Sequence, residues 1–304
     1  MKKHGTIKLI LLVFALINIF YILNTKANAS DDDYENGLVA YYPFDGNAND
    51  MSGNGNHGSI TSSVNFDLGL DGLAANFQGM TNPGYIYIPN STSLQFYNEC
   101  TFVFFAKLTT ITGMDESHQA SDYGLHCVFA KSHDNSGFYS QLVSSSSKKL
   151  TAKFMNNEYT SPKFSVTEFA KKYEIGTWLH IAFVLTQNTG SAYVNGTNVN
   201  TKSGTIDFNT ANSEDLYFGA FSDFLFPFNG LIDDVRIYNR ALSTEEIQTL
   251  YEQPFPPKIS PIADQITLED TATAPINFSI TDTNTNPDDL TLTAYSSSLT
   301  IVAI

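Results

Sequence analysis

Between Leu38 and Tyr238 the sequence is a succession of short runs rich in Val, Ile, Phe, Tyr and Thr, separated by Gly, Asn, Ser and Asp. Such runs predict β-strands, and the residues between them predict turns. Aromatic residues make up 13% of the chain, and helix signals are sparse. Short strands without intervening helices bury their apolar faces against a second sheet, so we expect an all-β, two-sheet antiparallel sandwich.

Two local signals are specific enough to place single elements. Asn195 and Gly196 both tolerate positive φ, which predicts a tight hairpin turn. Ser243 is followed three residues later by Glu246, the pattern of a capping box, so a short helix is expected to begin there and to close the domain.

Two segments near the ends of the strand-rich region join a strand pattern to oxygen-rich side chains. In the first, the run from Leu38 to Phe44 is followed by Asp45, Asn47, Asn49, Asp50, Asn54 and Asn56. In the second, alternation places Asp233 on the same face as Val235 and Ile237, and Asp234 on the opposite, outward face.

A carboxylate on an inward face is costly unless a cation or several hydrogen-bond donors compensate it. Oxygen ligands from Asp and Asn, with carbonyl groups freed by glycine turns, suit calcium at about 2.3 to 2.6 Å. The same residue types also form ordinary turns, and EF-hand spacing is absent from the sequence. The residues alone therefore leave a calcium site and a simple turn cluster as alternatives.

Three stretches carry a family resemblance: LVAYYPFDGNANDMSGNGNHG from Leu38, GTWLHIAFVLTQNTGSAYVNGTNVN from Gly176 and NGLIDDVRIYNRALSTEEIQTLY from Asn229. They resemble bacterial LamG-like jelly-roll domains of the concanavalin A-like lectin/glucanase superfamily, over residues 37–253. The resemblance implies a jelly-roll sandwich whose first and last strands are neighbours, with a structural calcium in several members where they meet. It suggests Asp45 and Asp233 as side-chain ligands, with Asp50 and His57 as weaker candidates, His57 through its carbonyl.

The N-terminus predicts export. Lys2, Lys3 and Lys8 precede an apolar stretch from Leu9 to Leu23, and small residues follow at Ala27 and Ala29. This is the layout of a signal peptide over residues 1–29, with cleavage after Ala29 and a short tail over 30–36. The apolar stretch is shorter than the roughly 20 residues that span a bilayer, so an uncleaved anchor is the alternative. We expect a secreted or cell-surface protein without membrane insertion of the mature chain.

The two cysteines, Cys100 and Cys127, would meet an oxidising compartment after export and could form a disulfide. If residues 101–108 and 127–131 pair as a simple hairpin, however, Cys100 lies at the far end of its strand from Cys127, beyond disulfide reach. The sequence leaves both outcomes open.

The amino-acid composition changes after Gln253. Four prolines within residues 254–261 indicate an extended linker. Residues 262–304 alternate apolar with Thr or Asp positions, as in a second β module, and resemble the opening of an immunoglobulin- or cadherin-like repeat. These residues are too few for such a sandwich, which needs about 100 residues. We therefore expect that the module is incomplete and that the chain is the N-terminal fragment of a longer protein.

Charge and motifs exclude several functions. The chain has 16 basic and 31 acidic residues and a net charge of -15, which disfavours nucleic acid and anionic membranes as partners. The E-x-D-x-x-E and E-x-D-x-E patterns of laminarinase-type glycoside hydrolases do not occur in it, nor does a G-x-S-x-G elbow. Its six histidines show no zinc-type spacing. We therefore expect no enzymatic activity.

A recognition or adhesion role remains, with a glycan or an extracellular protein as partner. The FSDFLFPF segment is the first choice for ligand contact, and its aromatic residues are Phe221, Phe224, Phe226 and Phe228. Inward packing of these rings is the alternative. The competing functional hypotheses are a targeting module of a larger extracellular enzyme, such as a glycoside hydrolase, and a structural spacer without a ligand.

Overall fold

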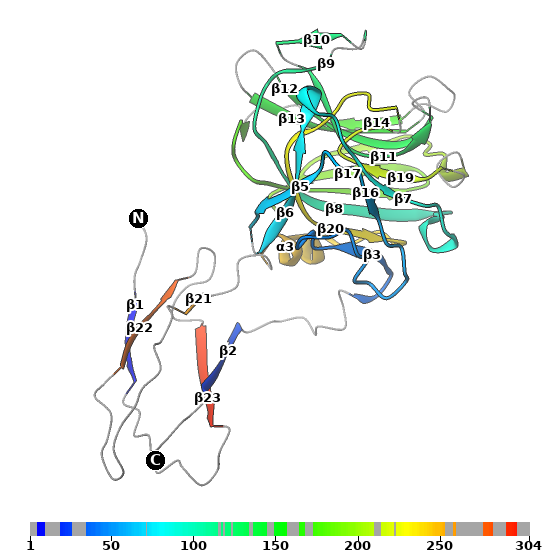
Figure 1. Ribbon diagram of the computed structural model, residues 1–304. Helices are drawn as coiled ribbons and strands as arrows, with labels where there is room; N and C mark the ends of the chain where they lie inside the picture. Colours follow the sequence, from blue (N-terminus) through cyan, green and yellow to red (C-terminus); the bar gives the residue numbers. More distant parts are fainter. Residues whose placement is uncertain are drawn as a thin grey trace, which may run out of the picture. The chain divides into compact units, whose positions relative to one another are not determined.

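The protein is seen in a computed structural model (Figure 1). The structure describes residues 5–9, 19–25, 35–70, 72–114, 117, 119–122, 124–133, 136–144, 149–156, 164–167, 173–209, 214–221, 223–252, 258–259, 276–281 and 290–296. The chain divides into two compact units, one of residues Tyr34–Pro254 and one that combines Met1–Asp33 with Phe255–Ile304.

The larger unit contains two antiparallel sheets, as the strand pattern predicts. The first sheet has ten strands, with the path β14-β13-β12-β11-β19-β7-β4 and three short strands beside it. Its members are β4 (Ser59–Ile60), β7 (Ile86–Ile88), β9 (Gly113–Met114), β10 (Ala120–Ser121), β11 (Leu125–His133), β12 (Ser136–Ser144), β13 (Lys149–Asn156), β14 (Phe164–Thr167), β15 (Tyr173–Glu174) and β19 (Leu216–Phe218).

The second sheet has eight strands, with the path β18-β17-β16-β8-β20-β6-β5 and β3 paired to β20. Its members are β3 (Leu38–Tyr42), β5 (Asn65–Leu68), β6 (Leu73–Gln78), β8 (Glu99–Leu108), β16 (Leu179–Thr186), β17 (Thr189–Val194), β18 (Thr197–Ser203) and β20 (Asn229–Tyr238). The 3-10 helices η1 (Gly79–Thr81) and η2 (Thr92–Leu94) lie in the connections, and the α-helix α3 (Thr244–Glu252) follows the last strand of this sheet.

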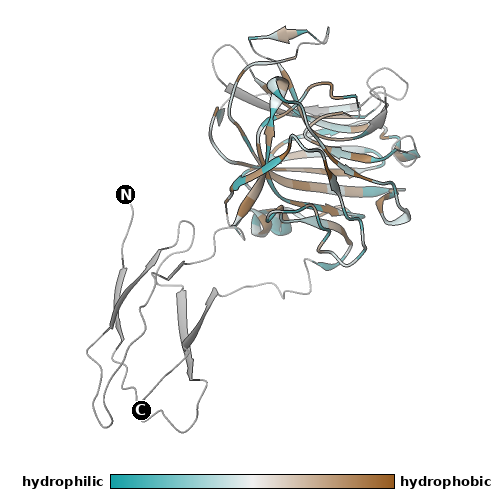
Figure 2. Cartoon of the chain, viewed as in Figure 1, coloured by the Kyte–Doolittle hydropathy of each residue, from teal (hydrophilic) through white to brown (hydrophobic). Residues whose placement is uncertain are grey.

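The main core lies between the sheets, and aromatic rings fill much of it. Phe102 and Phe104 on β8 face Phe129 on β11, and the rings of Phe102 and Phe129 stack with centroids 4.5 Å apart. Figure 2 shows hydrophobic and hydrophilic residues interspersed along the strands of this unit. The alternation expected for strands with one face in a shared core is therefore present.

The outer face of the eight-stranded sheet is partly covered by α3. Ile247 and Leu250 of this helix pack with Val103, Ala182 and other residues that alternate with the core positions of β8 and β16. The predicted capping box is confirmed, because Ser243 N donates to Glu246 Oε2 at 2.7 Å and Glu246 N donates to Ser243 Oγ at 3.2 Å. The predicted hairpin turn is confirmed too, with φ of 49° at Asn195 and 74° at Gly196.

The first and last strands of the sandwich are neighbours, as the family resemblance implies. β3 pairs antiparallel with β20, with Tyr42 opposite Val235 and Tyr41 opposite Arg236. Residues nearly 200 positions apart are thereby brought to one edge of the sandwich. The two oxygen-rich segments therefore share one region of the fold.

A β-bulge in β20 corrects the predicted orientation of its acidic pair. The register against β8 shifts between Asp233 and Arg236, and Asp234 has a φ of 48°. Ile232 faces the core before the bulge and Val235 after it, so simple alternation fails at this point. Asp233 pairs with Phe105 and lies on the outer face of the sheet, where it is nevertheless completely buried.

The two cysteines are free thiols, so the disulfide that the sequence left open is not formed. Cys100 lies on β8 and packs in the main core, whereas Cys127 lies on β11 in the other sheet. Cys127 belongs to a separate cluster with Tyr139 and Phe221, on the face of its sheet that points away from the main core. The two thiols are thus in different sheets and different apolar clusters.

The second unit contains two small sheets. One has the order β1-β22-β21 and the other pairs β2 with β23. The strands are β1 (Gly5–Leu9), β2 (Ile19–Thr25), β21 (Lys258–Ile259), β22 (Ile276–Thr281) and β23 (Leu290–Ser296). The immunoglobulin- or cadherin-like repeat over 262–304 stays a prediction.

Several predictions of the domain organisation concern the ends of the chain. β1 and β2 fall within the predicted signal peptide, whereas its cleavage point after Ala29 and most of the linker over 254–261 lie outside the described residues. No helix among the described residues is both long and apolar enough to cross a membrane. The signal peptide stays a prediction, which N-terminal sequencing of exported protein would test.

Candidate functional site

Asp233 sits in a buried polar site beside the turn between β5 and β6. Its Oδ2 accepts a hydrogen bond from Leu70 N at 3.0 Å, and its Oδ1 accepts one from Asp234 N at 2.9 Å. A Cβ atom at Gly69 would lie 2.5 Å from Asp233 Oδ2, so this close approach requires glycine. Burial raises the pKa of Asp233 to about 7, and the nearby charges of Asp234 and Asp45 act in the same direction.

Asp45 reaches the same turn from the first oxygen-rich segment. Its Oδ1 accepts a hydrogen bond from Leu73 N at 2.7 Å, and a Cβ atom at Gly72 would collide with it. The structure therefore brings Asp45 and Asp233 to one turn, 188 residues apart in sequence by their numbers. Two like-charged carboxylates at one turn form an arrangement that a divalent cation would stabilise.

Asp50 and His57 serve the loop that connects β3 to β4. Asp50 accepts hydrogen bonds from the backbone N–H groups of Tyr41, Ser52 and Asn56, at 2.9 to 3.0 Å. Burial alone would raise the pKa of Asp50, but these hydrogen bonds outweigh it and the pKa is lowered. The Asp50 N–H donates in turn to His57 Nδ1 at 3.1 Å. These contacts already account for both residues as supports of the loop.

Asp234, which strand alternation places on the outward face, is not an exposed charge. It is buried, with 8% of its surface exposed, and its Oδ1 accepts a hydrogen bond from Tyr41 Oη at 2.8 Å. Arg236 lies 3.6 Å from the same oxygen and stacks over the Tyr41 ring at 4.2 Å. The bulge turns Asp234 toward β3, which the strand alternation could not indicate.

The aromatic segment before β20 is mostly packed inward. Phe221 and Phe226 pack against the outer face of the ten-stranded sheet, and Phe228 lies in the main core. Only Phe224 of the four is exposed, at 39%, with its ring 4.9 Å from that of Tyr85. The alternative of inward packing therefore holds for three of the four rings, and Phe224 remains exposed. Contact of this segment with a ligand stays a prediction.

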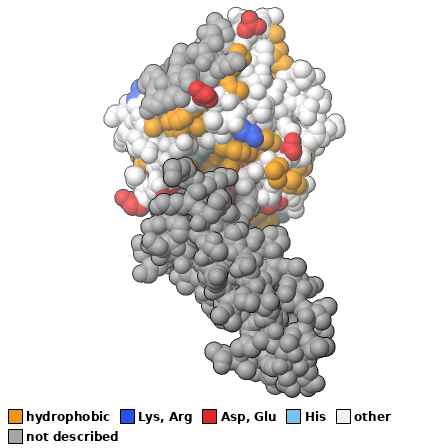
Figure 3. All heavy atoms as spheres, turned by 90° about the vertical axis from the view of Figure 1, so that its left-hand side faces the viewer, with side chains coloured by type: hydrophobic (Ala, Val, Ile, Leu, Met, Phe, Trp, Pro, Cys, Tyr) orange, Lys and Arg blue, Asp and Glu red, His pale blue; other side chains and the backbone are white. Residues whose placement is uncertain are grey.

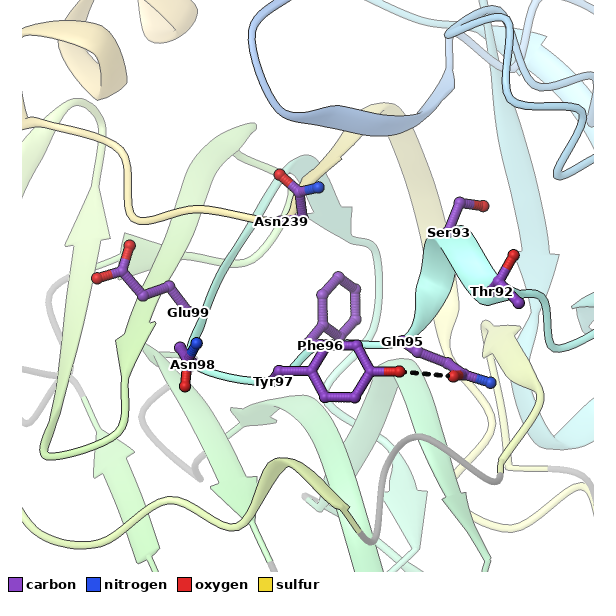
Figure 4. Close-up of a pocket in the computed structure, with 8 residues that line it drawn as sticks. All are labelled: Thr92, Ser93, Gln95, Phe96, Tyr97, Asn98, Glu99 and Asn239. Atoms are coloured by element: carbon purple, nitrogen blue, oxygen red, sulfur yellow. Dashed lines mark hydrogen bonds between the residues drawn. The ribbon is translucent and has the colours of Figure 1, made fainter.

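A pocket of about 510 Å³ lies at the edge of the sandwich, between η2, the start of β8 and the end of β20 (Figure 4). It is lined by Thr92, Ser93, Gln95, Phe96, Tyr97, Asn98, Glu99 and Asn239. Tyr97 is 65% exposed, and its hydroxyl donates to Gln95 Oε1 at 3.0 Å. An exposed aromatic ring surrounded by amide, hydroxyl and carboxylate groups matches the groups that ligand pockets use for stacking and for orientation.

Sequence reasoning did not select this pocket. The segment from Thr92 to Glu99 carries no repeated motif, and Asn239 follows the last strand 140 positions beyond Glu99 by its number. One sequence signal could have pointed to the pocket. Between two predicted strands, aromatic and amide residues follow one another as Gln95, Phe96, Tyr97 and Asn98. The pairing of β8 with β20 brings these distant residues together.

Six large hydrophobic residues are exposed in the described part of the chain, and two of them, Leu68 and Leu73, are cross-strand neighbours. The six are Met51, Ile60, Leu68, Leu73, Tyr97 and Phe224. Figure 3 shows one face of the protein, where hydrophobic side chains form separate patches and charged side chains are scattered. Among the described residues, no group of three or more His, Cys, Asp or Glu side chains is arranged to hold a metal ion.

Two antiparallel sheets packed face to face, with joined first and last strands, define the class of the protein as a concanavalin A-like sandwich. The family described as the concanavalin A-like lectin/glucanases superfamily matches residues 81–248, more than half of the chain. The chain belongs to this superfamily. No curated protein sequence matches it.

Solved structures with this fold include domains of larger proteins. Domain 4 of AbnA, an extracellular GH43 arabinanase from Geobacillus stearothermophilus, was solved in complex with arabinotriose; it is 25% identical, with a TM-score of 0.51, over 70% of this chain and 98% of that domain. The binding domain of Paraclostridial Mosquitocidal Protein 1 is 18% identical, with a TM-score of 0.57, over 75% of this chain and 55% of that one.

A structure of botulinum neurotoxin type C, whose cell entry depends on interaction with two ganglioside molecules, shares the fold with 13% identity and a TM-score of 0.55. The match covers 74% of this chain and 53% of that one. The chain thus spans about half the length of the two toxin chains. At these identities the toxins show the fold alone, whereas the arabinanase domain is matched over nearly its whole length.

Proposed function

We propose that residues Tyr34–Pro254 form a non-catalytic recognition module of a secreted or cell-surface protein, and that the Tyr97 pocket binds a glycan. The observation that carries this proposal is the exposed Tyr97 ring in a pocket with three amide side chains, from Gln95, Asn98 and Asn239. Sugar rings present apolar C–H faces and hydroxyl groups, which an aromatic ring and amides complement. The arabinotriose complex of the arabinanase domain supports the same ligand class.

The charge of the protein limits which class of glycan can bind. Glu99 lines the pocket, and the chain has a net charge of -15. A ligand that carries carboxylate or sulfate groups would be repelled by both. We therefore infer a neutral glycan, and a short arabino-oligosaccharide is the first probe because the arabinanase domain was solved with one.

A second candidate follows from the architecture of that neighbour. Its domain belongs to a glycan-degrading enzyme, so this module could direct a larger extracellular enzyme to its substrate. Glycan binding at the pocket is common to both candidates. The sequence of the full-length gene distinguishes them, since only the second requires a catalytic domain in the same protein.

Titration calorimetry with arabino-oligosaccharides and a neutral glycan array test the pocket. Tyr97→Ala is expected to weaken binding about tenfold or more, because the loss of about 1.4 kcal/mol of contact energy changes Kd by that factor. The Tyr97 side chain is mostly exposed, so the thermal unfolding temperature should change little.

Leu68→Ala is the matched control, since Leu68 is exposed at 76% and does not line the pocket. It should bind as the unaltered protein does. Equal affinities of the Tyr97 variant and the control would place the glycan elsewhere, and Phe224 would be the next ring to replace. No binding to any neutral glycan by folded protein would contradict the proposal as a whole.

We also propose that calcium stabilises the module at Asp45 and Asp233. The support is chemical: a buried carboxylate with a raised pKa lies beside a second carboxylate at a glycine-containing turn. A bound calcium ion would offset the repulsion between the two charges, and backbone carbonyl groups or water would complete its six to eight oxygen ligands, a typical number. The ion would tie the β5–β6 turn to the junction of the first and last strands.

Thermal unfolding with calcium and with a chelator tests this second proposal. A calcium concentration about 100 times the Kd stabilises by about 2.7 kcal/mol, which corresponds to roughly 5 to 10 °C in Tm for a domain of this size. Asp233→Asn should abolish the difference between calcium and chelator. Asp67→Asn, at an exposed position on β5, should keep it. Identical melting curves of the unaltered protein in both conditions would show that calcium has no role.

A further inference from the structure

Lys131 is a buried lysine that the proposed function does not use. It lies on β11, and its side chain is completely buried at 0% exposure. Its Nζ donates a hydrogen bond to Asn90 Oδ1 at 3.0 Å and a second one to the backbone oxygen of Glu214. Both acceptors are neutral, whereas a buried ammonium group is usually paired with a carboxylate.

Three segments that meet in one sheet create this contact. Asn90 follows β7, Glu214 precedes β19, and Lys131 is near the end of β11. In the ten-stranded sheet β19 pairs with both β7 and β11, so these segments converge at the same end of three adjacent strands. The contact joins residues that are 41 positions apart in sequence.

The surroundings favour a neutral amine. Burial lowers the pKa of Lys131 to about 8, against the opposing charges of Asp215 and Glu214. A minor fraction of the amine, about a tenth at pH 7, is therefore uncharged. An uncharged lysine in a desolvated site is a nucleophile. The Lys131 Nζ lies 3.0 Å from Asn90 Oδ1, an atom bonded to the carboxamide carbon Cγ. A nucleophile held next to its target group reacts as if at very high concentration.

Asp215 holds the backbone of Asn90, the other residue of the contact. Its Oδ1 accepts a hydrogen bond from the Asn90 backbone N–H at 2.6 Å, and its side chain also interacts with the Tyr87 hydroxyl. The Asn90 backbone is thus held in place from one side while its carboxamide contacts the lysine on the other. Asp215 acts as a positioning residue for the carboxamide.

We propose that Lys131 and Asn90 form an intramolecular amide bond, so that β11 is covalently linked to the segment after β7. The Lys131 Nζ attacks the Asn90 Cγ, the Nζ–Cγ bond forms and the Cγ–Nδ2 bond breaks. One proton passes from Nζ to Nδ2, and ammonia leaves. The reaction exchanges one amide for another and needs no oxidant, metal or energy source.

The link would close a covalent ring of residues 90–131, which includes β8 and the core residues that it carries. Both cysteines of the chain are free thiols, so this bond would supply the kind of cross-link that a disulfide provides in other exported proteins. Unlike a disulfide, it would resist reducing agents, because it contains no sulfur bond.

Mass spectrometry of the denatured full-length chain tests the proposal. The expected mass is lower than the sequence mass by one ammonia, once the N-terminal residue has been identified. Protease digestion should release a branched peptide that joins Lys131 to Asn90. Lys131→Met should restore the full mass, and Asn90→Asp should lose one water in place of ammonia, since a carboxyl group then provides the leaving atom.

Asp215→Asn separates positioning from a structural role. Mass spectra of freshly synthesised protein taken over time should show slower loss of ammonia in this variant, with the same branched product. An unmodified mass of the unaltered protein would overturn the proposal and leave an ordinary hydrogen bond. Ammonia loss that persists in Lys131→Met, or that maps to another asparagine, would overturn it as well.

Discussion

His180 offers a quantitative test of how the module responds to acid. It lies on β16, completely buried, with its ring 4.8 Å from that of Phe105 and 5.6 Å from that of Tyr251. Neither ring nitrogen has a hydrogen-bond partner among the described residues. Burial lowers the pKa of His180 from 6.5 to about 3, and the charge of Arg236 contributes in the same direction.

The sign of the pH effect follows from these two pKa values. The unfolded chain binds a proton at this histidine below about pH 6.5, whereas the folded chain does not until about pH 3, so acid favours the unfolded state. Each pH unit between the two values removes about 1.4 kcal/mol from the free energy of unfolding. From about pH 7.5 to about pH 5 the loss due to His180 amounts to roughly 2 kcal/mol.

Replacing His180 by leucine removes this titration and two unpaired polar atoms. The His180 backbone bonds to Asn195, with His180 N donating to Asn195 Oδ1 and Asn195 N donating to the His180 oxygen, do not depend on the side chain. Urea unfolding at about pH 7.5 and about pH 5 should show that the variant's advantage over the unaltered protein grows by about 2 kcal/mol at the lower pH. Any repacking cost is the same at both pH values and cancels in this difference.

Ile181→Leu on the same strand is the control, because it repacks the core without altering a titratable group. Its effect should be the same at both pH values. A His180→Leu variant whose stability follows the same pH profile as the unaltered protein would refute the reasoning. His126 and the other titrating groups are present in all three proteins, so they cannot produce the expected difference.

Two further predictions concern the packing and the helix. Phe102→Ala removes a ring stacked on Phe129 between the sheets and should cost about 3 to 5 kcal/mol in urea unfolding, as buried Phe truncations do; a loss below about 1 kcal/mol would mean that the sheets close over the cavity. Ser243→Ala removes the hydroxyl that accepts the Glu246 N–H and should cost about 1 kcal/mol by the same measurement; an unchanged stability would show that the Glu246 side chain and the bound Arg240 suffice to hold the start of α3.

The fold was predictable because the signals that specify it lie within short stretches of sequence and recur along the chain. Strand runs, the Asn195–Gly196 turn and the Ser243 capping box each depend on a few neighbouring residues, and all three are present in the structure. The neighbouring positions of the first and last strands came from the family resemblance and are confirmed by the pairing of β3 with β20. The orientation of Asp233 and Asp234 was not predictable, because one bulge residue reverses the alternation that the prediction used.

The candidate sites also separate what the sequence could predict from what only the tertiary structure decided. The sequence by itself determined the all-β character and the net negative charge, and the family resemblance suggested the candidate pair Asp45 and Asp233. Only the tertiary structure placed Asn239 beside Tyr97, separated Cys100 from Cys127 and brought Lys131 to Asn90. Strand pairing between distant segments decides such contacts, and the register of each pair depends on bulges and turns throughout the sheet that no local residue pattern contains.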